Sequence, residues 1–418
     1  MLKILCGARM DFLSFNEERA MKNWKIVLGI LTANVVFMAA SYTMLIPFLP
    51  MYLIKELGVS QEDVKMWSGV IFSVTFLIGG IMAPIWGKLA DTHGKKPMAI
   101  RSGLGLAISY LLGAIVTSPE QMFGVRVLQG FAAGLWSVCL AIATSSVPMD
   151  KLGTSLGVLQ AGLTAGGVIG PLLGGALATL FGMRASFYVG GFLLLLITAV
   201  FYFYIPEPPK QAEDTKKAVK EENEPHLLRQ PRIREALIYA GLVQMVILLI
   251  QPILSLYVAE LNHSMDNIVF MAGLVFSLFG IASATTAPMW GRFGQRRGFY
   301  LSLSLSALTG GTMIIVSAVP DSLYVFTAVN FVIGLFFAGI NPSISAILAN
   351  NTRQNQRGRI FGFMFSAQQF GSMVGPLAGG AIATYFPLKM VFVTAGSVLL
   401  AISAIVFKRH HSEKPAEM

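Results

Sequence analysis

Twelve apolar runs, each long enough to cross a lipid bilayer, constrain the fold of this chain more than any other feature. About 20 residues of helix span the hydrocarbon core, where only helices and closed barrels satisfy their own backbone groups. The pattern therefore predicts an all-α integral membrane protein with twelve transmembrane helices in two six-helix bundles. The runs lie near residues 25–49, 66–86, 98–116, 122–147, 155–180, 185–205, 236–257, 268–290, 299–318, 323–349, 358–384 and 388–407.

The composition supports the same class of protein. Of the 418 residues, 55% are hydrophobic and only 12% are charged, whereas a soluble domain carries about twice that charged fraction. A net charge of +10 would fit a nucleic-acid partner, but the bases fall mostly in alternate loops rather than on one soluble face. Cys6 and Cys139 offer neither a disulfide framework nor a metal-ligand spacing. We expect a lipid bilayer as the partner, no nucleic acid and no cofactor.

The positions of the bases predict the orientation in the membrane. Twenty-six of the 31 Lys and Arg residues lie at the two ends of the chain, in the central polar stretch or in the loops on that same side. Arg126 lies inside a run, and the opposite loops hold only Lys55, Lys65, Arg184 and Lys389. Short loops rich in Lys and Arg stay in the cytoplasm. We therefore predict a multi-pass protein of the cell (inner) membrane with both termini cytoplasmic.

These observations divide the chain into five parts. We expect a cytoplasmic leader over residues 1–23, a first bundle over 24–205, a linker over 206–234, a second bundle over 235–408 and a cytoplasmic tail over 409–418. The linker is polar, mixed in charge and short of core-forming residues, which favours a flexible segment.

The two halves repeat each other at an offset of 204–205 residues. Parallel six-helix halves that flank a midplane cavity are typical of transporters that rock between two states. Three matches in register indicate a duplication: Ala83-Pro-Ile-Trp-Gly-Lys88 with Ala287-Pro-Met-Trp-Gly-Arg292, Gly170-Pro-Leu-Leu-Gly-Gly-Ala176 with Gly375-Pro-Leu-Ala-Gly-Gly-Ala381, and Gly69-Val-Ile-Phe-Ser73 with Gly273-Leu-Val-Phe-Ser277.

The connection between the second and third runs concentrates charge and glycine. Gly87 and Gly94 allow helix ends to approach closely and turn sharply, because neither carries a Cβ. Asp91 is an acid at a membrane boundary that needs a partner. A generic cytoplasmic loop would also carry bases, but the pattern G-x-L-A-D-x-x-G-K-K resembles the cytoplasmic signature loop of the major facilitator superfamily. The stretch reads Gly87-Lys-Leu-Ala-Asp91-Thr-His-Gly94-Lys95-Lys96-Pro97.

The fourth run contains an arginine among apolar residues. A charge at a helix centre costs about 2.5–3.5 kcal/mol on insertion scales, so Arg126 should have a partner or a task. Gln129 lies on the same helix face, and Gly130 follows it. One interpretation is an interfacial arginine that reaches lipid headgroups. The spacing R-x-x-Q-G also resembles the fourth-helix signature of the superfamily, which implies a role in proton coupling. Asn330 occupies the equivalent position in the second half.

A proline flanked by glycines stands in the middle of the fifth run. Such a proline removes a backbone donor, and the glycines let neighbouring helices pack closely around the bend. A generic kinked helix would share these properties. The pattern G-x-x-x-G-P-x-x-G-G also resembles the fifth-helix motif of superfamily exporters, and the second half repeats it with Gly375 and Pro376. The first copy consists of Gly166, Gly170, Pro171, Gly174 and Gly175.

From Trp24 to Lys408 the chain resembles the twelve-helix drug:proton antiporter branch of the major facilitator superfamily. The resemblance implies export of amphipathic drug-like compounds by alternating access, driven by proton influx, with one chain as the functional unit. It also implies that Asp91 pairs with nearby bases and caps a helix of the other half near Gly358, which locks the cytoplasmic side. Gln295 stands where the second-half loop would hold this acid, so the lock is expected to be asymmetric.

Proton and substrate sites are less clearly marked. None of the 21 acids lies in the middle of an apolar run, so the candidate proton sites are the boundary acids Glu56, Asp91 and Glu260. The cavity is expected to be apolar and aromatic with neutral polar groups, because a buried amide needs a hydrogen-bond partner. The candidate cavity residues are Asn34, Tyr42, Gln160, Gln244, Gln251, Gln368 and Gln369.

Two other functions are compatible with this kind of sequence. A proton-coupled transporter of one metabolite, such as a sugar or a siderophore, would favour paired charges in the cavity, and the runs contain none. A non-transporting membrane receptor would favour a soluble signalling domain, which is not visible. An enzyme is not expected, because no nucleophile constellation, metal set or phosphate-binding loop is present in the sequence.

Overall fold

The computed structural model describes residues 24–205, 207, 229–262, 267–352 and 356–413, and the regular structure in these segments is helical without strands. The first half contains α2 (Trp24–Met44), η1 (Ile46–Phe48), α3 (Leu49–Lys55), α4 (Val64–His93), α5 (Lys95–Ile115), α6 (Pro119–Ala132), α7 (Leu135–Ser146), α8 (Met149–Phe181) and α9 (Met183–Tyr204). The second half contains α11 (Pro231–Asn262), α12 (Ile268–Arg297), α13 (Phe299–Val316), α14 (Leu323–Phe337), α15 (Ile340–Asn350), α16 (Arg357–Tyr385) and α17 (Lys389–Glu413).

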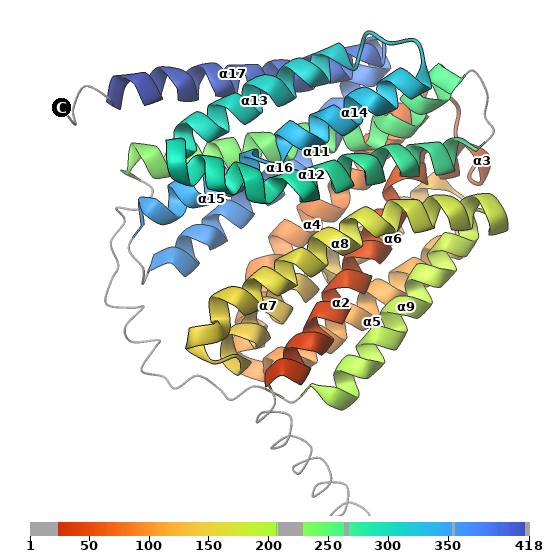
Figure 1. The fold of residues 1–418 in the computed structure, drawn as a ribbon. Coiled ribbons are helices and arrows are strands. Elements are labelled where there is room, and N and C mark those ends of the chain that lie inside the picture. The colour runs from red at the N-terminus through yellow and green to blue at the C-terminus, as the bar shows by residue number, and fades with distance from the viewer. Residues whose placement is uncertain (1–23, 206, 208–228, 263–266, 353–355, 414–418) are drawn as a thin grey trace, which may run out of the picture.

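Figure 1 shows the halves as two adjacent bundles, the first coloured red to yellow-green and the second green to blue. Among the described residues, 11 helical stretches are long and apolar enough to cross a membrane. The remaining predicted run, 358–384, forms α16, a 29-residue helix that packs against α11 and α4. Its glycines and glutamines make it less apolar than the others. The all-α, twelve-helix membrane fold is therefore confirmed.

Three of the predicted helices are interrupted. The fourth run breaks between α6 and α7, where Gly134 adopts a left-handed conformation with φ of 119°. The tenth run breaks in the equivalent place between α14 and α15. The first run breaks at η1, where Pro47 and Pro50 lack the N–H groups that a continuous helix would use.

The predicted duplication is visible in side-chain contacts as well as in sequence. The indole N–H of Trp86 on α4 donates to the carbonyl of Phe131 at 2.8 Å, near the end of α6. In the second half, Trp290 on α12 donates to the carbonyl of Leu335 on α14 at the same distance. Donor and acceptor are each displaced by 204 residues between the halves. The repeated sequences therefore make repeated contacts.

The halves meet along two helix pairs, α4 with α16 and α8 with α12. A Cβ at Gly69 on α4 would come within 2.5 Å of the carbonyl oxygen of Pro376, and Gly273 on α12 lies equally tightly against Pro171 on α8. Two serines complete these contacts. Ser277 donates to the carbonyl of Val168 at 2.8 Å, and Ser73 donates to the carbonyl of Met373. We call these two pseudo-equivalent contacts the seam.

The predicted part boundaries fall mostly outside the described residues. This holds for the leader over 1–23, for most of the linker over 206–234 and for the end of the tail over 409–418. At the edges that are described, α11 already begins at Pro231, and α17 continues to Glu413. The five-part division remains a prediction.

Candidate functional site

A cavity of about 320 Å³ lies in the first half and is lined mainly by apolar and aromatic side chains of α2, α4, α5, α7 and α8. Its polar lining includes Tyr42, Thr75, Gln129 and Gln369. Gln369 belongs to α16, so the second half closes part of this cavity. The predictions that Tyr42 and Gln369 line a cavity are consistent with this geometry.

Arg126 lies against the wall of this cavity and is only 3% exposed. One guanidinium nitrogen, Nη1, donates to Oε1 of Gln129 at 2.9 Å, while Nε and Nη2 have no hydrogen-bond partner among the described residues. The guanidinium carbon stands 5.6 Å from the centre of the Phe72 ring. Tyr42 and Tyr110 line the same cavity. Within the described part of the chain, the arginine is thus held by an amide and by the Phe72 ring, without a carboxylate.

Tight packing of α6 against α4 fixes the position of Arg126. A Cβ at Gly130 would come within 2.7 Å of Ile78 and of the carbonyl oxygen of Thr75. The Thr75 hydroxyl in turn donates to the carbonyl of Arg126 at 3.3 Å. Since the side chain of Thr75 also lines the cavity, the backbone that carries Arg126 is anchored to the cavity wall.

Arg101 stabilises the broken end of α6. Its guanidinium donates to the carbonyls of Phe131 at 3.0 Å and Ala133 at 3.1 Å, and it stacks 3.7 Å from the Trp86 ring centre. Carbonyls at a helix C-terminus lack intrahelical donors and favour a nearby cation. From the sequence, Arg101 was only one of the bases that indicate the cytoplasmic side.

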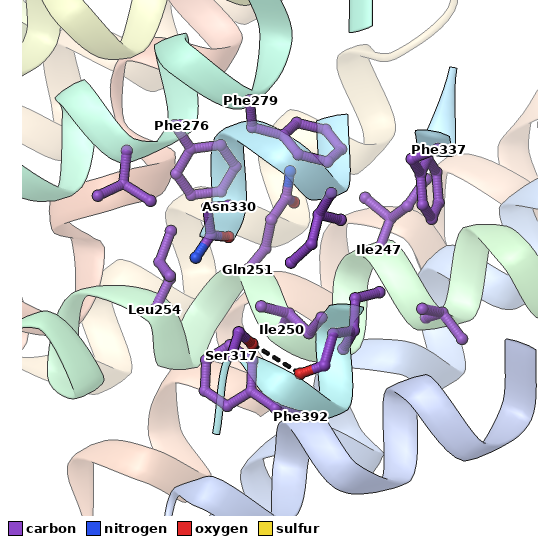
Figure 2. A pocket seen from close by; sticks show the side chains of 14 residues that line it. Ile247, Ile250, Gln251, Leu254, Phe276, Phe279, Ser317, Asn330, Phe337 and Phe392 are labelled. Carbon is purple, nitrogen blue, oxygen red and sulfur yellow. Dashed lines mark hydrogen bonds between the residues drawn. The ribbon is translucent and has the colours of Figure 1, made fainter. Parts of the chain in front are cut away.

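A second cavity of about 80 Å³ lies in the second half, among α11, α12, α13, α14 and α17 (Figure 2). Phe276 and Phe279 form part of its wall, and Gln251 and Asn330 are among its polar groups. The Asn330 amide donates to the carbonyl of Phe326 at 2.9 Å, whereas Oε1 of Gln251 has no partner in the described segments. Asn330 is equivalent to Arg126, so this cavity is neutral where the first has a cation beside it.

Four predicted cavity residues line neither of these two cavities. The amide of Asn34 points into the first bundle, where it makes a long 3.5 Å contact with the carbonyl of Ile197. Gln160 is exposed, and Gln244 and Gln368 are half-buried on α11 and α16. Apart from Tyr42, the aromatic liners were not singled out from the sequence, because aromatic residues are too common in the apolar runs. They include Tyr110, Trp136, Phe276 and Phe279.

The signature loop turns at Gly94, whose φ of 103° is favourable only for glycine. The ammonium group of Lys95 donates to the carbonyl of Ala141 at 3.0 Å and to Ser145 Oγ at 2.5 Å, near the end of α7. The side chain of Asp91 and the surroundings of Gly358 lie outside the described residues. The lock that these residues would form therefore stays a prediction.

Glu207 is a further residue of this loop region that the sequence did not indicate, because it falls in the predicted linker. Its carboxylate accepts the backbone N–H groups of Lys95 at 2.6 Å and Lys96 at 2.9 Å, which begin α5. An acid at a helix N-terminus satisfies free N–H groups and interacts favourably with the helix dipole. Glu207 therefore connects the end of the first bundle to the signature loop.

Replacing Glu207 by alanine should loosen the start of α5. Loss of an N-terminal cap costs about 0.5–2 kcal/mol, which corresponds to roughly 2- to 30-fold faster amide hydrogen exchange. We expect this acceleration at Lys95 and Lys96, measured by hydrogen–deuterium exchange with mass spectrometry. Glu62→Ala, in the exposed turn before α4, is the control. Unchanged exchange at Lys95 and Lys96 would show that Glu207 does not hold this helix end.

The glycines of the proline motif pack the helices within each half. Gly166, Gly170 and Gly174 lie against α2 at the backbones of Val36, Ala40 and Met44. In the second half, Gly371, Gly375 and Gly379 lie in the same way against α11 at Gly241, Met245 and Leu249. Close packing around the bend, as the motif predicts, occurs in both halves, and the prolines turn their carbonyls toward the seam.

Each of the four helices that meet at the seam has one glycine that touches the other half, which we call its seam glycine. A second glycine lies 18 residues away, which is about five turns, so both glycines lie on the same face of the helix. A Cβ added at any seam glycine would lie within about 3 Å of an atom of the other half. At the four distant glycines, no described atom of a neighbouring element lies within 4 Å of the added Cβ. The four pairs are Gly69 and Gly87 on α4, Gly175 and Gly157 on α8, Gly273 and Gly291 on α12, and Gly380 and Gly362 on α16.

The candidate proton acids have different surroundings. Glu56 forms an ion pair with Arg184 at 2.8 Å, and Arg184 also donates to the carbonyls of Ala114 and Val116. Glu260 is exposed near the end of α11. The Glu56 carboxylate thus already has a cationic partner, Arg184.

Two duplicated helix bundles that contact each other along the seam and each contain a largely apolar cavity are typical of secondary transporters, and comparison with known proteins identifies the family. The chain belongs to the Major Facilitator Superfamily, whose family model matches residues 31–291 and 269–417. It is 33% identical to the multidrug resistance protein MdtG of Salmonella arizonae over 380 residues, which is 90% of this chain and 94% of the relative. The MdtG protein of Salmonella heidelberg is equally similar over 385 residues.

Solved structures share the fold. A mutant of the nucleoside transporter NupG superposes with a TM-score of 0.75 at 15% identity, covering 91% of this chain and 99% of that one. A bacterial homolog of the human lysosomal transporter Spinster, inward-facing and occupied, gives 0.77 at 14% identity, covering 93% and 97%. At such identities the likeness concerns the fold alone. The family match, the curated relatives and the apolar helices of the described residues show a multi-pass membrane transporter.

Proposed function

We propose that this protein exports amphipathic, drug-like compounds across the cell (inner) membrane by alternating access. The observation that carries the proposal is the glycine pattern of α4, α8, α12 and α16: the glycines at one end of a shared face touch the other half, and those at the other end, which we call the open end, have no described neighbour within 4 Å. Relatives that are named multidrug resistance proteins support the substrate class, as does a largely apolar and aromatic cavity.

The proposed orientation rests on the bases near the open end. Lys88, Lys95 and Lys96 lie at the end of α4 opposite the seam, and such bases favour the cytoplasmic side. Both termini would then be cytoplasmic, and the seam would close the outer side. In this state, substrates would enter from the cytoplasm or the inner leaflet, and a single chain would suffice for transport.

We propose proton influx as the driving force. The acids available are Glu56, Asp91 and Glu260, and Arg126 is the buried cation beside the larger cavity. Because no acid lies in the middle of a run, coupling would use groups at the membrane boundaries together with this arginine.

Ethidium efflux tests this function directly. Inverted vesicles or liposomes that contain the protein should move ethidium when a proton gradient is imposed, and a protonophore should abolish the movement. Gradient-independent movement would contradict proton coupling. No movement of ethidium or of several neutral, cationic and anionic drugs would contradict broad export and favour a transporter of one metabolite.

A further inference from the structure

The charge beside the larger cavity indicates which substrates it accommodates. We infer that this cavity binds the anionic group of amphipathic organic acids at Arg126 and Gln129, with the apolar body of the ligand against its aromatic wall. The inference rests on the proposed export function and adds a substrate class to it: organic anions bearing a carboxylate.

Arg126 is a charge without a counterion in the described part of the chain. A guanidinium stays protonated in proteins, and burying one without an anionic partner is costly. At 3% exposure, Arg126 makes one hydrogen bond to the described residues, to a neutral amide, and two of its nitrogens make none with them. Acids do not occur in the middle of any run of the sequence, and Glu56 and Asp321 pair with Arg184 and Lys389 at other places.

A ligand in the cavity reaches the Arg126 guanidinium past Gln129. Gln129 stands between the guanidinium and the cavity, since it lines the cavity and binds Nη1 through Oε1. Its own Nε2 is buried without a partner among the described residues. A carboxylate that takes the place of Oε1 can accept N–H groups from Arg126, and the rotated amide can donate to it through Nε2. Carboxylates match the fork of an arginine with two parallel hydrogen bonds.

The two halves differ in the charge beside their cavities. The second-half cavity is also aromatic, with Asn330 where the first half has Arg126. In a medium of low dielectric constant, a single cation favours an anionic ligand over a neutral or cationic one. Charge preference should therefore originate in the first half alone.

Two dansyl ligands with the same apolar body test this inference. Dansylglycine carries a carboxylate and dansylglycinamide a neutral amide, and their fluorescence reports binding to the purified full-length protein without a proton gradient. We expect the wild-type protein to bind the carboxylate at least 10-fold more tightly. In Arg126→Gln the two ligands should bind within about twofold, while Arg126→Lys should recover part of the preference. Arg292→Gln removes the same charge from an exposed site and should leave the preference intact.

Equal binding of the two ligands by the wild-type protein would overturn the inference, and this comparison needs no variant to fold. An undiminished preference in Arg126→Gln would overturn the assignment to Arg126. Transport of dansylglycine, dansylglycinamide and ethidium into inverted vesicles separates these results from a failure of the proposed function. Anion preference in binding without transport of any of the three compounds contradicts export but supports the anion site, whereas export without anion preference contradicts the site alone.

Discussion

Replacing Gly87 by valine should nearly abolish export while leaving the fold intact. In the present state, no described atom of a neighbouring element lies within 4 Å of a Cβ at this position, so the larger side chain is accommodated. In the opposite state, α4 must close at this end onto the antiparallel helix α16, near Gly362. Side chains forced into a tight contact typically cost about 1–3 kcal/mol, which would reduce the population of that state about 5- to 150-fold.

Two measurements on Gly87→Val separate this effect from misfolding. Ethidium transport in inverted vesicles should fall by at least 10-fold, and the thermal midpoint of the purified protein should stay within a few degrees of the wild type. Gly124→Val introduces the same side chain on α6, also with no described neighbour within 4 Å, and should transport normally. Wild-type transport by Gly87→Val would show that the glycine pattern does not mark a second contact of the halves.

The fold was predictable because its main determinants are local or repeated in the sequence. Membrane helices need about 20 apolar residues, and the runs are therefore visible without any knowledge of their neighbours. The duplicated segments with Trp86 and Trp290 make the same hydrogen bond in each half. Ser73 and Ser277 likewise end a segment that is repeated in the sequence. In the structure they donate equivalent hydrogen bonds across the seam.

The candidate site was less predictable, because it depends on how each helix is rotated about its axis. Gln368 and Gln369 are adjacent in sequence and equally polar, yet only Gln369 lines the first-half cavity. The break at Gly134 was missed because the residues around it are as apolar as the rest of the run. Glu207 was missed for another reason: its partners are backbone N–H groups of α5, more than 100 residues earlier in the chain.

The seam is symmetric, whereas the charge beside the cavities is not. Both halves contribute one glycine and one serine to equivalent contacts with the proline-bent helix of the other half. Only the first half has a buried arginine near its cavity in the described segments, since Asn330 occupies the second position. Movement would thus be shared by the halves, while selection for charge would be a property of one of them.

Gly69→Val should have the opposite conformational effect to Gly87→Val. A Cβ at Gly69 would stand 2.5 Å from the carbonyl oxygen of Pro376 and 3.3 Å from Cα of Gly380, which are both backbone atoms with little freedom to move. Valine should therefore open the seam and favour the state that exposes the cavity on the outer side. An overpacking cost of about 3 kcal/mol would change the ratio of the two states about 150-fold.

Accessibility of a cavity cysteine measures this shift. With Cys6 and Cys139 replaced and Leu163→Cys as the reporter in the first-half cavity, a membrane-impermeant maleimide added from outside should label Gly69→Val much faster than its parent. Ser277→Ala removes one seam hydrogen bond, worth about 1 kcal/mol, and should accelerate labelling no more than about fivefold. If Gly69→Val and its parent label at the same rate, contact at the seam does not hold the outer side closed. A large increase in Gly69→Val with a small one in Ser277→Ala would instead show that backbone packing at the seam glycines, more than hydrogen bonding, determines which side of the membrane the cavity faces.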